Sequence, residues 1–176
     1  MAQMTVGAAT TNEDYLNRRA EQLVIEGYRL LAGLADSPAK LTSPSVLRLY
    51  HDNLGEPAGA EAAVALERLV AALKTFRASP IAAYPPGSRF ISPDEVLVLG
   101  IIAGIQHWDE QIFRVCLKQL CAESDRIKVA ASAETFAMTL YNAGMILAPL
   151  PFSLRARIVR QSDTRRLKAP ASITLH

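Results

Sequence analysis

The sequence predicts an all-α protein, a single-domain bundle of five or six helices with a proline-rich mid-chain loop and a basic C-terminal tail. Half of its residues are hydrophobic, yet only 6% are aromatic. Alanine and leucine dominate the apolar set, whereas valine, isoleucine and threonine do not form alternating runs. Several segments repeat apolar residues at spacings of three and four, which is typical of helices that pack along one side.

The length and the termini set the domain organisation. A chain of 176 residues suits one domain that is large enough to bury a core without disulfides or metals. We place the helical bundle at residues 1–152 and the basic tail at residues 153–176. Residues 1–15 have neither the basic start nor the apolar centre of a secretion signal, so we expect a cytoplasmic protein. The apolar run at 96–105 is about half the length of a bilayer span, so we expect no membrane span.

The first helix is expected within residues 11–36. Small and apolar residues recur there at spacings of four and three, which forms a seam for a packing partner. The seam consists of Leu16, Ala20, Leu23, Gly27, Leu30 and Leu34. The charged residues, including Glu21 and Arg29, fall mostly off this seam and are expected to face water. Pro38 prevents continuation of the helix.

Two further helices follow. Ser43 as N-cap, Pro44 in the first turn and Gly55 after the end predict a short helix over residues 44–54. A long amphipathic helix is predicted over residues 57–78, where a second seam appears. This seam consists of Ala62, Leu66, Leu69, Leu73 and Phe76.

Residues 79–91 contain three prolines and a glycine and cannot form regular helix. We expect this loop to brace the two halves of the chain, because Ile81, Tyr84, Phe90 and Ile91 would then be covered. In the alternative, the loop presents Tyr84 and Arg89 to a partner.

The second half of the chain begins with a strong helix start at Ser92, Pro93 and Glu95. This helix is apolar on all sides through residue 105, which predicts burial on nearly every side. The pattern becomes amphipathic beyond that point, with a kink or break expected between residues 104 and 108. The last long helix, over residues 125–146, is rich in small residues and is expected to lie centrally.

The sequence contains no catalytic or metal-binding signature. Cys116 and Cys121 lie about 140° apart around one predicted helix, so we expect two buried thiols rather than a disulfide. No CxxC or HxxxH spacing occurs, and we therefore expect no metal and no other cofactor. Phosphate loops, dinucleotide fingerprints and nucleophile elbows are also missing. These absences predict a protein that is not an enzyme.

The stretch QHWDE at residues 106–110 is the richest in reactive side chains. His107 and Glu110 lie three residues apart and could form an acid–base or metal-binding pair. The simpler interpretation is a helix that leaves the core, with Trp108 as a packing anchor. A ligand-binding or enzymatic pocket near His107, Trp108 and Tyr141 would require a deep cavity that contains at least two of these side chains.

The tail is the clearest departure in charge. Residues 153–176 contain six basic residues against Asp163 alone, a net charge of +5, while the rest of the chain carries −3. The basic residues are Arg155, Arg157, Arg160, Arg165, Arg166 and Lys168. Such a tail could bind phosphates, an acidic protein or anionic lipid, or could be a solvated end. Leu154, Ile158 and Leu167 also allow a short amphipathic helix that docks on the body or on a second subunit.

These observations predict a non-catalytic interaction or regulatory protein that acts through protein–protein contacts. A homodimer through the first or third helix is a specific form of this hypothesis. The first alternative is a nucleic-acid-binding protein that uses the arginine-rich tail, although no aromatic residues lie between the arginines to stack on bases. The second alternative is the pocket near residues 107, 108 and 141.

Overall fold

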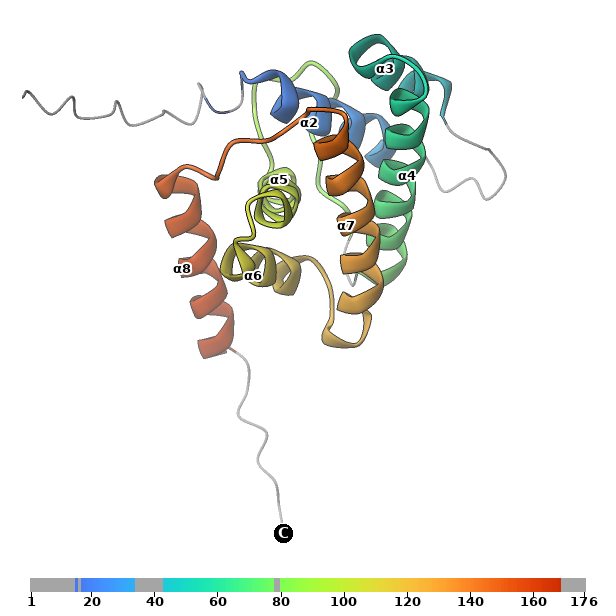
Figure 1. Ribbon diagram of the computed structural model, residues 1–176. Helices are drawn as coiled ribbons and strands as arrows, with labels where there is room; N and C mark the ends of the chain where they lie inside the picture. The colour runs from blue at the N-terminus through green and yellow to red at the C-terminus, as the bar shows by residue number, and fades with distance from the viewer. Residues whose placement is uncertain (1–14, 16, 34–42, 78–79, 169–176) are drawn as a thin grey trace, which may run out of the picture.

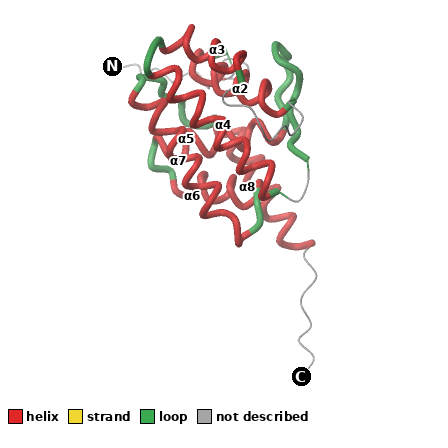
Figure 2. Tube along the Cα trace, turned by 90° about the vertical axis from the view of Figure 1, so that its right-hand side faces the viewer, coloured by secondary structure: helices red, strands yellow, loops and turns green. Residues whose placement is uncertain are grey.

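The computed structural model describes residue 15 and residues 17–33, 43–77 and 80–168, with side chains described as far as residue 160. Within these ranges the regular elements are seven α-helices and one short 3-10 turn, with no strand. They are α2 (Arg19–Ala32), α3 (Pro44–Leu54), α4 (Ala58–Phe76), α5 (Pro93–Gln106), α6 (Glu110–Leu120), the turn Glu123–Asp125, α7 (Arg126–Asn142) and α8 (Phe152–Lys168). Figures 1 and 2 show a bundle built from helices and loops, which confirms the predicted all-α class.

The helix count exceeds the predicted five or six for two reasons. The segment after residue 93 is broken at residues 107–109, so it forms both α5 and α6. Residues 152–168, expected as a tail that was at most partly helical, form the continuous helix α8. Of the first predicted helix, residue 15 and residues 17–33 are described, and its remaining positions lie outside the described ranges.

Helix α5 is the enclosed centre of the bundle (Figure 1). All but two of its fourteen residues are buried, and it packs against α2, α6 and α7. Its first turn is closed by the predicted capping box, in which Ser92 and Glu95 exchange hydrogen bonds of 3.1 and 2.6 Å. A Cβ at Gly100 would lie 2.5 Å from the Cys116 sulfur, so this glycine lets α6 pack closely on α5. No described helix is both long and apolar enough to cross a bilayer.

The seams of α2 and α4 are buried against other helices of the same chain. A Cβ at Gly27 would lie 2.7 Å from a methyl carbon of Leu66, which places α2 close to α4. A Cβ at Gly59 would lie 2.7 Å from the Cα of His51, so α3 and α4 approach backbone to backbone. The described residues of both predicted seams are therefore buried or partly buried within the chain, while positions 16 and 34 lie outside the described residues.

Helix α7 lies against α4 and α5, but it is not central. Its buried residues share one side of the helix, and its other side faces solvent. The buried residues are Val129, Ala133, Phe136, Ala137 and Leu140. The expectation of a central helix is therefore wrong, because small residues allow close packing on one side without requiring neighbours on the other.

Two expectations about exposure are also wrong. Glu21 and Arg29 were expected to face water, but both are buried. Phe90 was expected to be covered by the loop, but it is 72% exposed, and Tyr84 is exposed beside it. The two cysteines are buried with free thiols, as predicted.

Candidate functional site

Helix α8 docks on the bundle through α6. Leu154 and Ile158 are buried on its inner side, and the side chain of Gln119 donates a hydrogen bond of 2.9 Å to the Ile158 carbonyl. The guanidinium of Arg155 forms an ion pair with the carboxylate of Asp109 at the start of α6. The first part of α8 is thus fixed by apolar contacts, a hydrogen bond and an ion pair.

The six basic residues predicted as a binding site divide into three groups. Arg155 is half-buried and is used internally by Asp109. Arg157 and Arg160 are exposed, and Arg160 also donates a hydrogen bond of 3.1 Å to the Ala156 carbonyl. Positions 165, 166 and 168 belong to the same helix, but their side chains lie outside the described residues. The structure therefore assigns one of these arginines to docking the helix.

Asp109 connects this helix to the end of α5. Its carboxylate accepts a hydrogen bond of 3.1 Å from the Ile112 N–H, which caps α6. Partial burial opposes its ionisation, but the bonds from Ile112 and Arg155 outweigh that effect and hold the pKa of Asp109 below its usual value. The Asp109–Arg155 pair is therefore charged at neutral pH, and the net charge of the two residues is zero.

Helix α5 ends in a tight turn at Trp108. The Trp108 N–H bonds to the Ile105 carbonyl at 3.3 Å, and the Asp109 N–H bonds to the Gly104 carbonyl at 2.8 Å. These bonds define a Schellman motif, whose left-handed residue is usually glycine. Here that residue is Trp108, with a φ of 57°. It is 89% exposed, so the expectation that it anchors packing is wrong.

A second exposed ring lies near this turn. Phe152, the first residue of α8, is 85% exposed. Both neighbours of Trp108, and Arg155 one turn after Phe152, line a small hollow of about 10 Å³ between α5, α6 and α8. Its lining is Ala103, Gly104, His107, Asp109, Ile112, Pro149, Leu150 and Arg155. The turn at Trp108 and the first turn of α8 thus meet at this hollow, a relation that their separation in the sequence does not reveal.

The three residues of the predicted pocket, His107, Trp108 and Tyr141, have different surroundings in the structure. His107 bonds through Nε2 to the Leu147 carbonyl at 2.6 Å and helps to hold the segment that leads into α8. Tyr141 is exposed on α7. Of the three, only His107 lines the small hollow, which is far smaller than a typical ligand pocket. Among the described residues, the hollow beside His107 is therefore too small for the deep cavity that the pocket hypothesis requires.

The solvent side of α7 carries a row of exposed residues that we call the outer stripe, and these residues are apolar except for Glu134 at its centre. Its members are Ile127, Ala131, Glu134, Met138 and Tyr141. All five are exposed, and Ile127 is 82% exposed. Their spacing of four, three, four and three residues places them along one line of the helix. This spacing was readable in the sequence, but the apolar residues on the opposite side of the helix concealed which side was buried.

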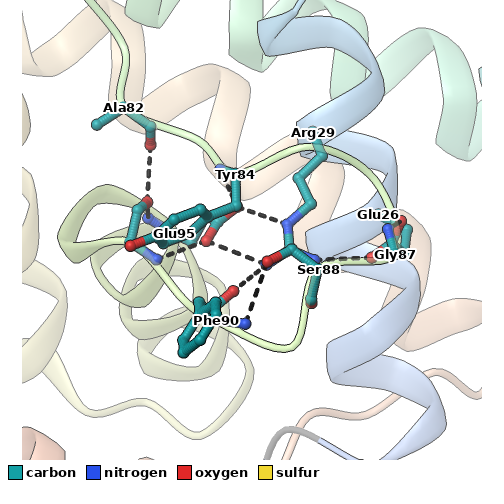
Figure 3. Close-up of polar contacts among 9 residues, drawn as sticks. Glu26, Arg29, Ala82, Tyr84, Gly87, Ser88, Phe90 and Glu95 are labelled. Carbon is teal, nitrogen blue, oxygen red and sulfur yellow. Dashed lines mark hydrogen bonds and ion pairs between the residues drawn. The ribbon is translucent and has the colours of Figure 1, made fainter.

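A buried ion pair joins α2 to α5 beneath the mid-chain loop (Figure 3). Arg29 Nε lies 2.7 Å from a carboxylate oxygen of Glu95, and neither side chain is accessible to water beyond 3%. The guanidinium also donates hydrogen bonds to the carbonyls of Ser88 and Phe90 at 2.9 and 2.5 Å. Glu26 accepts bonds from Arg29 and from the Gly87 N–H, both at 2.9 Å. The loop is therefore braced, as the first of the two interpretations predicted.

A groove of about 650 Å³ lies between α2 and this loop. Its volume falls within the range of small-molecule sites. The charged side chains of Glu26 and Arg29 in its wall are already bonded to each other and to the loop. We therefore assign these two residues to holding the loop in place.

The described residues hold no candidate metal centre, and one buried thiol is unreactive. They contain no group of three histidine, cysteine, aspartate or glutamate side chains that could hold a metal ion. Burial raises the pKa of the Cys116 thiol to about 12, so this thiol remains protonated at neutral pH and is a poor nucleophile.

Glu21 is a buried carboxyl group that is only partly bonded. One of its oxygens accepts a hydrogen bond of 2.7 Å from the Ala148 N–H, and the other has no partner among the described residues. Burial raises the pKa of Glu21 above its usual value. The folded protein therefore retains a proton that the unfolded chain loses, and this group makes stability fall as pH rises above the usual glutamate pKa.

We expect Glu21→Gln to raise the free energy of unfolding at neutral pH, because the amide keeps the acceptor for Ala148 and removes the cost of ionisation. Urea unfolding at acidic and neutral pH, followed by circular dichroism, measures the effect. The gain should vanish at acidic pH. Glu61→Gln, exposed on α4, is the matched control. A loss of stability at neutral pH in Glu21→Gln would contradict this account.

Comparison with known proteins found no similar protein. The chain matches no protein-family model, no curated protein and no solved structure.

Proposed function

We propose that this chain is a non-catalytic helical interaction protein that self-associates through the outer stripe of α7. The observation that carries the proposal is the exposed row at helix-seam spacing on α7, in which four of the five residues are apolar. A row of this kind is normally buried against another helix. Within the described part of the chain, its side of α7 faces solvent.

The shape and composition of the stripe suit a second copy of the same helix. Ala131 leaves space between the larger Ile127 and Glu134, so a bulky side chain from a facing helix can enter there. In an isologous dimer, which is the commonest symmetric assembly, the same stripe lies on both sides of the contact. The seventeen residues of α7 extend for about 25 Å, long enough for several such layers.

The dimer surfaces first expected on α2 and α4 are less suitable. Leu23, Gly27 and Leu66 are buried against other parts of the same chain. A dimer through those residues would have to displace contacts that already form the core. We therefore place the contact on α7.

We expect Met138→Glu to shift the protein from dimer to monomer, because each copy would then place a second carboxylate in the contact, one turn from that of Glu134. Light scattering coupled to size-exclusion chromatography measures the mass. Gln111→Glu, which adds the same charge to an exposed position of α6, is the matched control and should remain dimeric. Equal masses for wild type and Met138→Glu would refute the contact.

A further inference from the structure

Two exposed aromatic residues lie near the N-terminal end of the basic helix α8. Trp108 comes from the turn after α5, and Phe152 begins α8. The Asp109–Arg155 ion pair ties the residue after Trp108 to a residue one turn beyond Phe152. The arginine-rich segment therefore follows directly on Phe152 and is tied to the turn that carries Trp108.

The fold itself does not account for tryptophan at this position. The left-handed backbone at residue 108 favours glycine, and a bulky side chain there is disfavoured. The ring is almost wholly exposed, so it gains little from packing. Strained residues of this kind are enriched at binding sites. We take the ring to be directed at a ligand.

The outer side of α8 is positively charged, and the exposed carboxylate of Glu110 near Trp108 is paired with Arg114. Phe152 and Arg160 lie on the side of α8 opposite to Leu154 and Ile158, which face the bundle. Arg157 is exposed on the flank of that side. Asp109 adds no net negative charge, because Arg155 neutralises it. The sequence of α8 beyond residue 160 adds three basic residues and one acidic residue.

We propose that the rings of Trp108 and Phe152, together with the outer side of α8, bind single-stranded nucleic acid. Each ring stacks on an unpaired base, and the arginines neutralise neighbouring phosphates. This binding does not depend on self-association through α7, which uses a different helix.

Other anionic ligands fit the surface less well. Bases in a duplex are stacked on each other, so their faces are not available to exposed rings. Carboxylates of an acidic protein are repelled by the negative face of an aromatic ring. An anionic membrane would bind an apolar side of α8, but Leu154 and Ile158 are buried against the bundle. Exposed ring faces beside arginines therefore favour unpaired bases.

The test uses the intact protein and a fluorescein-labelled deoxythymidine oligonucleotide. We expect binding at low salt, with quenching of the emission of Trp108, the only tryptophan. Trp108→Gly should weaken binding by about tenfold in fluorescence anisotropy, because one stacking contact is lost. Glycine suits the left-handed turn, so this variant should fold at least as stably as wild type. Circular dichroism during thermal unfolding checks the fold.

Two further variants separate stacking from charge. Arg157→Gln/Arg160→Gln should reduce the slope of log affinity against log salt by about 1.4, because two phosphate contacts are removed. Phe90→Ala removes an exposed ring from the mid-chain loop and should leave binding unchanged. Any of three outcomes would overturn the proposal: equal affinity of Trp108→Gly and wild type, preference for the same sequence as a duplex, or ring-dependent binding to phosphatidylserine vesicles without binding to the oligonucleotide.

Discussion

Arg29→Ala is expected to lower the free energy of unfolding by about 3–5 kcal/mol, the cost of removing one partner from a buried ion pair. The buried carboxyl group of Glu95 would lose its guanidinium partner and would retain only the N–H groups of Tyr84 and Ser92 as donors. The carbonyls of Ser88 and Phe90 would lose their donor as well. Chemical denaturation measures the change.

The control for this prediction is Glu26→Ala. Glu26 bonds to the same guanidinium, but its side chain is partly exposed, so its loss should cost about 1 kcal/mol or less. The double variant should be less destabilised than the sum of the two single changes, because both remove bonds to one network. An effect of Arg29→Ala no larger than that of Glu26→Ala would show that the buried pair does not support the loop.

Phe136→Ala is expected to cost about 3–5 kcal/mol, since it removes a fully buried ring from the contact between α7 and the rest of the bundle. The ring packs edge-on against Tyr50, with 6.1 Å between the centroids. Tyr50 in turn donates a hydrogen bond of 3.2 Å to the Leu23 carbonyl. Loss of the Phe136 ring thus leaves a cavity among three helices.

Met138→Ala, two residues further along α7, tests the opposite side of the same helix. Met138 lies in the outer stripe, so its truncation should change the stability of the monomer by no more than about 0.5 kcal/mol. Denaturation at a protein concentration low enough to keep the chain monomeric measures both variants. Similar losses for Phe136→Ala and Met138→Ala would mean that the outer stripe is part of the monomer core.

Helix boundaries were predictable where local chemistry sets them. Ser92, Pro93 and Glu95 act within one turn, and the capping box they predicted is present. Gly55 follows α3 with a φ of 70°, in accord with the predicted end of that helix. The apolar character of α5 on all sides also predicted its burial, because few side chains there could face water.

The remaining features depend on contacts between distant segments. Arg29 is buried because Glu95, 66 residues away, meets it, and helix periodicity alone placed it in solvent. Trp108 was expected to pack, but the exposed turn after α5 left no neighbour for its ring. The sequence predicted a break of the helix between residues 104 and 108. It did not predict the Schellman hydrogen bonds at the break, because these form between backbone groups.

The candidate site was predictable in part. The charge of the tail predicted a binding element in this part of the chain, but only the fold shows that Arg155 is used by Asp109. Phe152 drew no attention in the sequence, because a single phenylalanine after a proline has no distinctive spacing. Its proximity to the turn at Trp108 follows from the docking of α8 on α6, which involves residues more than thirty positions apart.

Sedimentation equilibrium of the wild-type protein over a range of micromolar concentrations tests the central claim most directly. We predict a mass that rises with concentration from the 19.1 kDa of the monomer toward twice that value. A mass of 19.1 kDa at every concentration would contradict self-association through the outer stripe of α7.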